Sequence, residues 1–142
     1  MQKFKETVTL IDKDLPHNFL AEKIVLSSML ISSEAIEITS RKITVETFYF
    51  KNHQEIYKSI IFLHQSKKSI DILTIITFFR DQGLLKEVGG ITVLTELINQ
   101  VPNLVYLEDY IQLIQDKFLR RLLIKLGYNI INSSYITNIP LK

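Results

Sequence analysis

Two adjacent glycines, Gly89 and Gly90, stand directly before an apolar-periodic run in the stretch KEVGGITVLTELINQ. Glycines ahead of a helix can form a loop whose backbone N–H groups bind phosphate. A Walker-type loop also needs a following Lys and Ser or Thr, whereas Ile91 and Thr92 follow here, and the chain contains no GK[ST]. We therefore interpret the glycines as part of a turn and expect no cofactor-binding residue in this chain.

The histidines and acidic pairs do not predict a metal site or a catalytic acid–base pair. His53 and His64 are eleven residues apart in one expected helix, which separates them by ~16 Å along its axis. Two side chains so far apart cannot ligate one zinc ion, so we expect both to be partly exposed helical histidines. Acidic pairs such as Glu108-Asp109 lie where helices are expected to start and complement the helix dipole. The chain has no cysteine, which excludes a thiolate nucleophile.

The run KFLRRLLIK, from Lys117 to Lys125, has the composition of a binding helix. It carries four basic residues and no acidic one, interleaved with Phe and Leu. Such a helix can contact DNA phosphates, an anionic membrane or an acidic protein. We favour a solvated helix flank whose apolar residues pack in a helical hairpin; an acidic protein surface and nucleic acid stay open. The candidate interaction residues are Phe118, Leu122, Leu126, Lys117, Arg120, Arg121 and Lys125.

The elements that position these residues are expected to be helices, because apolar residues recur at three- and four-residue spacing. We expect helices over residues 18–31, 33–40, 52–64, 71–82, 91–100 and 107–135. Asn52 and Glu55 have the form of a capping box, Asp71 is expected to cap the next helix, and Gly83 is expected to end it. A strand over 70–79 stays an alternative because isoleucine is abundant there. The fold class predicted is all-α, a compact multi-helix head followed by a long C-terminal helix.

The last expected helix is longer than the body that carries it. About 28 residues at ~1.5 Å rise give roughly 42 Å. The remaining ~100 residues should form a globule with a radius of gyration near ~13 Å. Apolar residues continue nearly to the end of this helix. The distal part should therefore need a partner helix, either from another chain or from sequence absent here.

Composition bounds the class of protein. Hydrophobic residues at 46% and charged residues at 23% are typical of a folded domain, and a net charge of +2 does not by itself indicate a nucleic-acid binder. No segment has the length and composition of a membrane span or signal peptide. The 22 Ile, 13 Lys and 7 Asn have A/T-rich codons, so we expect a plastid stroma or a bacterial cytoplasm.

Several stretches, taken in order, resemble the N-terminal domain of DnaB-type replicative DNA helicases. They are PHNFLAEKIVLSSML at 16–30, Phe48-Tyr49, H-x-x-I-Y at 53–57, IDILTI at 70–75, GLLKEVGGITVLTEL at 83–97 and P-N-x₆-Y-x₆-K-x-L-R-R-L at 102–122. The likeness covers Pro16 to about Tyr135 with nearly unchanged spacing. Tyr106 departs from the small polar residue usual in that family, which leaves the local helix start open.

The resemblance implies an N-terminal arm over 1–15, a helical head over 16–101, a long helix over 102–136 and a tail over 137–142. The long helix looks like the first arm of a hairpin, or dimerisation subdomain, whose second arm is absent. In that family the N-terminal domains form a collar on a hexameric ring and bind primase. Single-stranded DNA, ATP and magnesium are bound by a RecA-like C-terminal domain that is also absent, so we expect no activity from this chain alone.

The leading hypothesis is therefore an assembly and primase-docking domain of a replicative DNA helicase. The chain is expected to be a fragment of a longer protein or a truncated reading frame. The alternative is a stand-alone helical adapter that binds acidic protein or DNA through Lys117, Arg120, Arg121 and Lys125. An enzyme acting alone lacks the residues that it would need.

Overall fold

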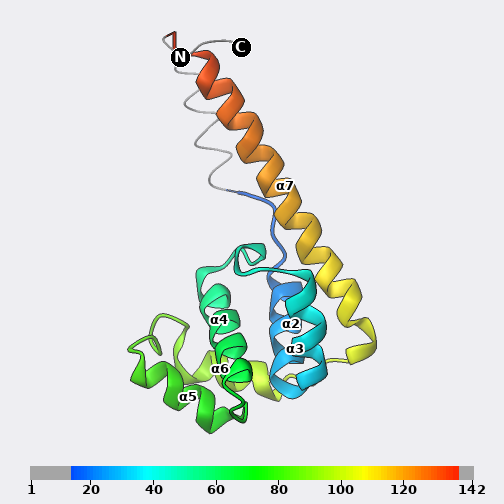
Figure 1. Cartoon of the computed structure of the whole chain (residues 1–142), viewed down its shortest axis with the longest axis vertical. Coiled ribbons are helices and arrows are strands. Elements are labelled where there is room, and N and C mark those ends of the chain that lie inside the picture. The colour runs from blue at the N-terminus through cyan, green and yellow to red at the C-terminus, as the bar shows by residue number, and fades with distance from the viewer. Residues whose placement is uncertain (1–13, 138–142) are drawn as a thin grey trace.

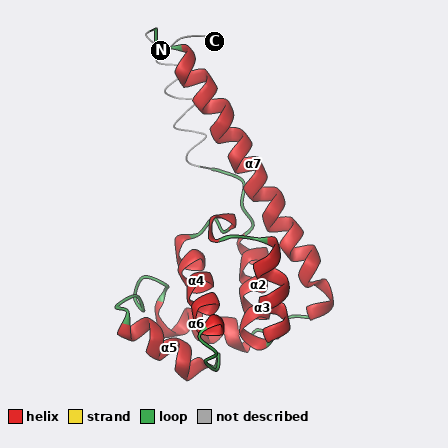
Figure 2. Ribbon diagram, in the orientation of Figure 1, coloured by secondary structure: helices red, strands yellow, loops and turns green. Residues whose placement is uncertain are grey.

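The computed structural model describes residues 14–137, so the expected arm over 1–15 and tail over 137–142 fall almost entirely outside the described residues. The described part is all-α and contains no strand (Figure 2), which confirms the expected fold class. Its elements are α2 (Phe19–Ile31), α3 (Ser33–Lys42), η1 (Val45–Thr47), α4 (Lys51–Gln65), α5 (Ile72–Asp81), α6 (Gly90–Asn99), η2 (Leu104–Tyr106) and α7 (Leu107–Ser134).

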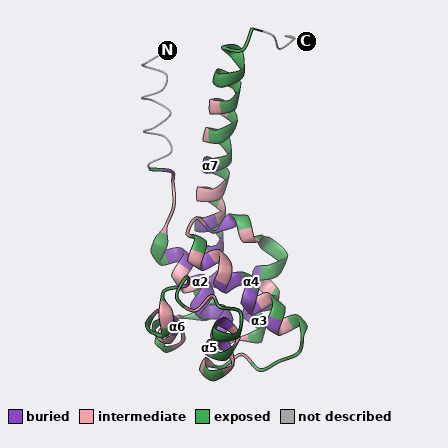
Figure 3. Cartoon of the chain, turned by 90° about the vertical axis from the view of Figure 1, so that its left-hand side faces the viewer, coloured by how far each residue is buried: buried purple, intermediate pink, exposed green. Residues whose placement is uncertain are grey.

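Helices α2 to α6 form a head, and α7 runs along α2 and α3 before it extends well past them (Figure 1). The head is built around α2, whose residues Val25, Leu26 and Met29 are almost completely buried. They pack with apolar residues of α4 such as Ile56 and Ile60 in one continuous core. Burial is concentrated in the head and the adjoining part of α7, whereas the distal part of α7 is largely exposed (Figure 3).

Local side-chain caps set several helix boundaries as expected from the sequence. The Ser32 hydroxyl accepts a hydrogen bond from the Ala35 N–H at 3.2 Å, so this residue both follows α2 and caps α3. The Asp71 carboxylate accepts a hydrogen bond from the Thr74 N–H at 2.8 Å, which lowers the pKa of Asp71. Gly83 follows α5 with a φ of 70°, in the left-handed region that glycine tolerates.

The expected capping box at Asn52 is wrong. Helix α4 begins at Lys51, and Phe50 takes the N-cap position without a side-chain cap. The Asn52 side chain instead donates a hydrogen bond to the Val88 carbonyl at 3.4 Å. Phe50 lies against the His53 and Phe19 rings at 5.3 and 5.1 Å. We attribute the start of α4 at Lys51, one residue before the expected Asn52 cap, to the packing of Phe50 against these rings.

The two glycines of the opening stretch form a turn. Gly89 has a φ of 107° and Gly90 a φ of 80°. The Gly89 N–H donates to the Lys86 carbonyl at 3.2 Å, and the Gly90 N–H donates to the Leu85 carbonyl at 2.9 Å. Both donors are thus used by carbonyls of the connection, and Gly90 is also the first residue of α6.

Replacing Gly89 with Ala is expected to lower the free energy of unfolding by at least about 1–2 kcal/mol, because a left-handed φ disfavours a Cβ. The added Cβ would also overlap the Val93 side chain. Thermal unfolding followed by circular dichroism measures the change. Gly127→Ala is the matched control, because nothing lies within 4 Å of a Cβ added there in α7. An equal loss in both variants would contradict a specific role for Gly89.

Candidate protein-interaction surface

Helix α7 has two parts with different surroundings. In the first part Leu107, Ile111 and Ile114 are buried against the head. Arg121 is the last buried residue of α7 in the described chain, and most large apolar residues beyond it are exposed. The helix therefore carries apolar side chains into solvent, where they have no core to join.

Five exposed apolar side chains of α7, one just before Arg121 and four beyond it, form a continuous line, which we name the exposed stripe. Its members are Leu119, Leu122, Leu123, Leu126 and Ile130, with exposed fractions of 56%, 46%, 59%, 57% and 59%. At 100° per residue they fall within an arc of roughly 100° on the helix surface. The intervals between Leu119, Leu123, Leu126 and Ile130 are four, three and four residues, the spacing at which one helix packs against another in a coiled coil.

The predicted apolar interaction residues divide between the two sides of α7. Leu122 and Leu126 lie in the exposed stripe. Phe118 does not belong to the stripe, because it is half-buried and its ring lies 5.6 Å from the Arg121 guanidinium. That Phe118 faces a partner helix stays a prediction. Leu119 and Leu123 were not among the predicted residues, although their heptad spacing with Leu126 could have revealed them.

Arg121 is used inside the molecule. Its side chain is 5% exposed, and its two terminal nitrogens donate to the carbonyls of Pro16 and Thr47, each at 2.8 Å. The guanidinium also lies over the Tyr49 ring at 5.4 Å. Burial lowers the pKa of Arg121, and the nearby Glu22 carboxylate opposes that shift. The expectation that Arg121 offers its charge to a partner is therefore corrected; its seven-residue spacing from buried Ile114 places it on the head side of the helix.

The other basic residues of the run are less concentrated than the sequence indicated. Arg120 donates to the Asp116 carboxylate at 2.9 Å, one helical turn away. Lys117 is half-buried and Lys125 exposed, and neither makes an ion pair within residues 14–137. The surface therefore carries one paired arginine and two lysines, and it is less positive than the four free cations expected from the sequence. The Arg120–Asp116 ion pair itself contributes little to stability.

A buried carboxylate–imidazole contact joins the first turn of α2 to α4. Glu22 of α2 and His53 of α4 are 1% and 2% exposed, and the Glu22 Oε1 lies 2.8 Å from the His53 Nδ1. The Glu22 Oε2 accepts a hydrogen bond from the Tyr49 N–H, also at 2.8 Å. The expectation that His53 is a partly exposed histidine is wrong, because α2 supplies a carboxylate from 31 positions away in the sequence.

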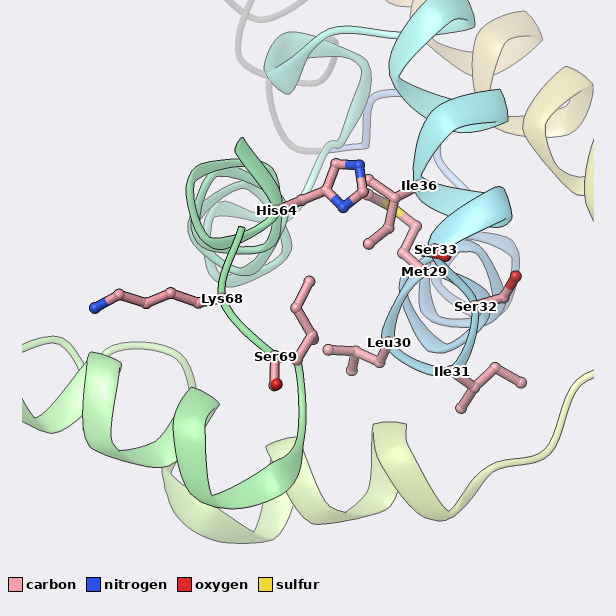
Figure 4. Close-up of a pocket in the computed structure, with 10 residues that line it drawn as sticks. Met29, Leu30, Ile31, Ser32, Ser33, Ile36, His64, Lys68 and Ser69 are labelled. Atoms are coloured by element: carbon pink, nitrogen blue, oxygen red, sulfur yellow. The ribbon is translucent and has the colours of Figure 1, made fainter. Parts of the chain in front are cut away.

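The described residues form no metal site, and two hollows lie on the head. His64 lies 2.7 Å from the Glu37 carboxylate, and no group of three His, Cys, Asp or Glu side chains in the described chain could hold a metal ion. His64 and Ile36 line a hollow of about 250 Å³ between α2, α3 and the end of α4 (Figure 4). A second hollow of about 420 Å³ lies between α3, η1 and α4, and Thr44 and Tyr57 are among the residues that line it. None of the helices described is long and apolar enough to span a membrane.

Comparison with known proteins places this arrangement in a family. Residues 14–116 match the family described as DnaB-like helicase N terminal domain. The chain is 64% identical over 133 residues to a probable replicative DNA helicase of Trieres chinensis, covering 94% of this chain and 29% of that protein. It is 34% identical over 122 residues to the replicative DNA helicase DnaB of Nostoc sp., covering 86% of this chain and 14% of that protein. The chain thus spans less than a third of these relatives.

A solved structure shows the same fold. The crystal structure of the N-terminal domain of DnaB helicase from Mycobacterium tuberculosis superposes with a TM-score of 0.81 at 29% identity, covering 87% of this chain and 89% of that one. The likeness therefore extends over the head and most of α7. With its helical head, its projecting α7 and the match over residues 14–116, this chain belongs to the DnaB-like helicase N-terminal domain family.

Proposed function

We propose that this chain is the assembly and primase-docking domain of a replicative DNA helicase. The observation that carries the proposal is the exposed stripe on a helix that projects beyond its own head. Apolar side chains at heptad spacing gain free energy when a second helix covers them, at about 25 cal/mol per Å² of apolar surface buried. A second copy of the chain, or the second arm of the hairpin in a longer protein, supplies such a helix.

Assembly into a ring is the role that this surface fits. The relatives of Trieres chinensis and Nostoc sp. are replicative DNA helicases by name. In the DnaB-type family the N-terminal domains form a collar on a hexameric ring, and unwinding requires ATP and magnesium in a C-terminal domain. We accordingly assign the unwinding of DNA to the longer protein and the pairing of subunits to this domain.

The cellular setting follows from composition and relatives. The abundance of Ile, Lys and Asn codons and the likeness to proteins of Trieres chinensis and Nostoc sp. support a plastid stroma or a bacterial cytoplasm. A helicase acting there meets primase at the replication fork.

Primase docking is tested by isothermal titration of this chain with the helicase-interaction domain of a related primase. We expect saturable binding whose affinity changes less than about tenfold between low and physiological salt, because Arg121 is internal and Arg120 is paired. The adapter alternative expects binding of single-stranded DNA or an acidic protein that weakens steeply with salt and is lost in Lys117→Glu/Lys125→Glu. Binding to DNA but not to primase would refute docking and support the adapter.

A further inference from the structure

We propose that Arg121 is the positioning residue that fixes the direction in which α7 leaves the head, and that it thereby sets the geometry of assembly. The consequence for assembly rests on the proposed function, whereas the positioning itself does not. Three segments meet at this guanidinium: the entrance to the head at Pro16, η1 at Thr47 and the middle of α7.

The geometry suits arginine and no other side chain. The planar guanidinium presents several donors in a fixed fork, so one side chain reaches two carbonyls that are 31 positions apart in the sequence. The rings of Tyr49 and Phe118 lie 5.4 and 5.6 Å from its central carbon. The contacts with Pro16, Thr47 and Tyr49 join α7 to the head, and the Phe118 ring of α7 packs beside the guanidinium.

The position of Arg121 along α7 allows its contacts to control the angle of the distal part of the helix. Packing of Leu107, Ile111 and Ile114 supports the root of the helix, and the Gln115 side chain donates to the Lys42 carbonyl at 2.9 Å. Arg121 is the last buried residue of α7 in the described chain, and four members of the exposed stripe lie beyond it. It is thus the outer of two supports, and the angle of the free part depends on it.

Small errors in this angle have large effects on helix pairing. The part of α7 beyond Arg121 is about 20 Å long at ~1.5 Å per residue. A tilt of about 10° at Arg121 moves its tip by roughly 3–4 Å, a large fraction of the 5.4 Å helical pitch. Closed rings require the same rotation at every interface, and an interface whose rotation varies gives open or mixed assemblies. A rigid clasp at Arg121 would keep that rotation constant.

Double electron–electron resonance tests the positioning directly. The chain has no native cysteine, so spin labels at Lys51→Cys in α4 and Asn132→Cys in α7 report the distance between head and tip. Dilution with unlabelled protein removes signals between copies. We expect a narrow distance distribution for the parent protein and at least a doubling of its width in Arg121→Ala. Arg120→Ala is the matched control, because it removes a neighbouring arginine that pairs only with Asp116, and it should keep the parent width.

Arg121→Lys separates positioning from stability. Lysine keeps the positive charge but cannot span both carbonyls, so the variant should remain folded and still widen the distribution. If folded Arg121→Ala and Arg121→Lys both keep the parent width, the proposal is overturned. Because the spin-label readout is made within one copy, it also holds if the chain proves monomeric. In that case the proposed assembly function fails while the positioning role stands.

If the parent chain does associate, light scattering should resolve one defined species for it and a mixture of sizes for Arg121→Ala. A single defined species for both, together with an unchanged distance width, would leave no role for Arg121 in assembly geometry.

Discussion

Under the proposed assembly role, Leu126→Asp is expected to make the chain monomeric while leaving the head folded. Leu126 lies at the centre of the exposed stripe and is 57% exposed, so its replacement removes no contact from the core. Covering one leucine contributes about 1.5–3 kcal/mol. In a two-fold symmetric pair each substitution counts twice. The combined loss of about 3–6 kcal/mol corresponds to a rise in the dissociation constant of roughly 10²–10⁴-fold.

Sedimentation velocity and light scattering over a concentration series measure this change. Leu113→Asp is the matched control, because Leu113 is on the same helix and 42% exposed but lies well away from the stripe. Circular dichroism checks that both variants keep their helices. The role assigned to the stripe is refuted if the parent chain is monomeric at high concentration, or if Leu113→Asp dissociates it equally. Phe118→Asp should instead destabilise the fold, since its ring lies against Arg121.

Glu22→Ala is expected to lower the free energy of unfolding by at least about 1–3 kcal/mol, the cost of leaving the buried His53 ring nitrogen without its hydrogen-bond partner. The substitution removes the partner of the His53 ring and the acceptor of the Tyr49 N–H at once. The His53 ring would stay buried without a replacement partner, because it is 2% exposed. The Glu22 carboxylate also favours the charged form of Arg121, so the support that Arg121 gives to the middle of α7 should weaken as well.

Equilibrium urea unfolding compares this variant with Glu96→Ala. Glu96 is 59% exposed and pairs with Lys23 at 3.9 Å, so its loss should change stability by no more than about 0.5 kcal/mol. Glu22→Gln keeps the shape of the side chain and one acceptor oxygen. Its loss of unfolding free energy should lie between those of Glu22→Ala and Glu96→Ala. A Glu22→Ala loss below about 1 kcal/mol would show that the buried pair does not hold α2 to α4.

The sequence alone was enough for the helical class, the order of the helices and most of their ends. Capping depends on residues only a few positions apart. The helix ends at Ser32, Asp71 and Gly83 can therefore be predicted from the local sequence. The overhang of α7 also followed from length, because helix rise and the size of a globule are fixed by general geometry. The strand alternative over 70–79 was wrong, since α5 occupies that segment.

Only the tertiary structure decided which polar groups are internal and which side of α7 is free. Glu22 and His53 come from different helices, and the two acceptors of Arg121 lie 105 and 74 positions before it. Periodicity describes a helix by itself and cannot tell which face another element will cover. For that reason Arg121 was expected at the partner surface and lies on the head side, whereas Leu119 and Leu123 line the exposed stripe. The face of α7 that is covered depends on long-range packing, because α2 and η1 contact it from distant parts of the sequence.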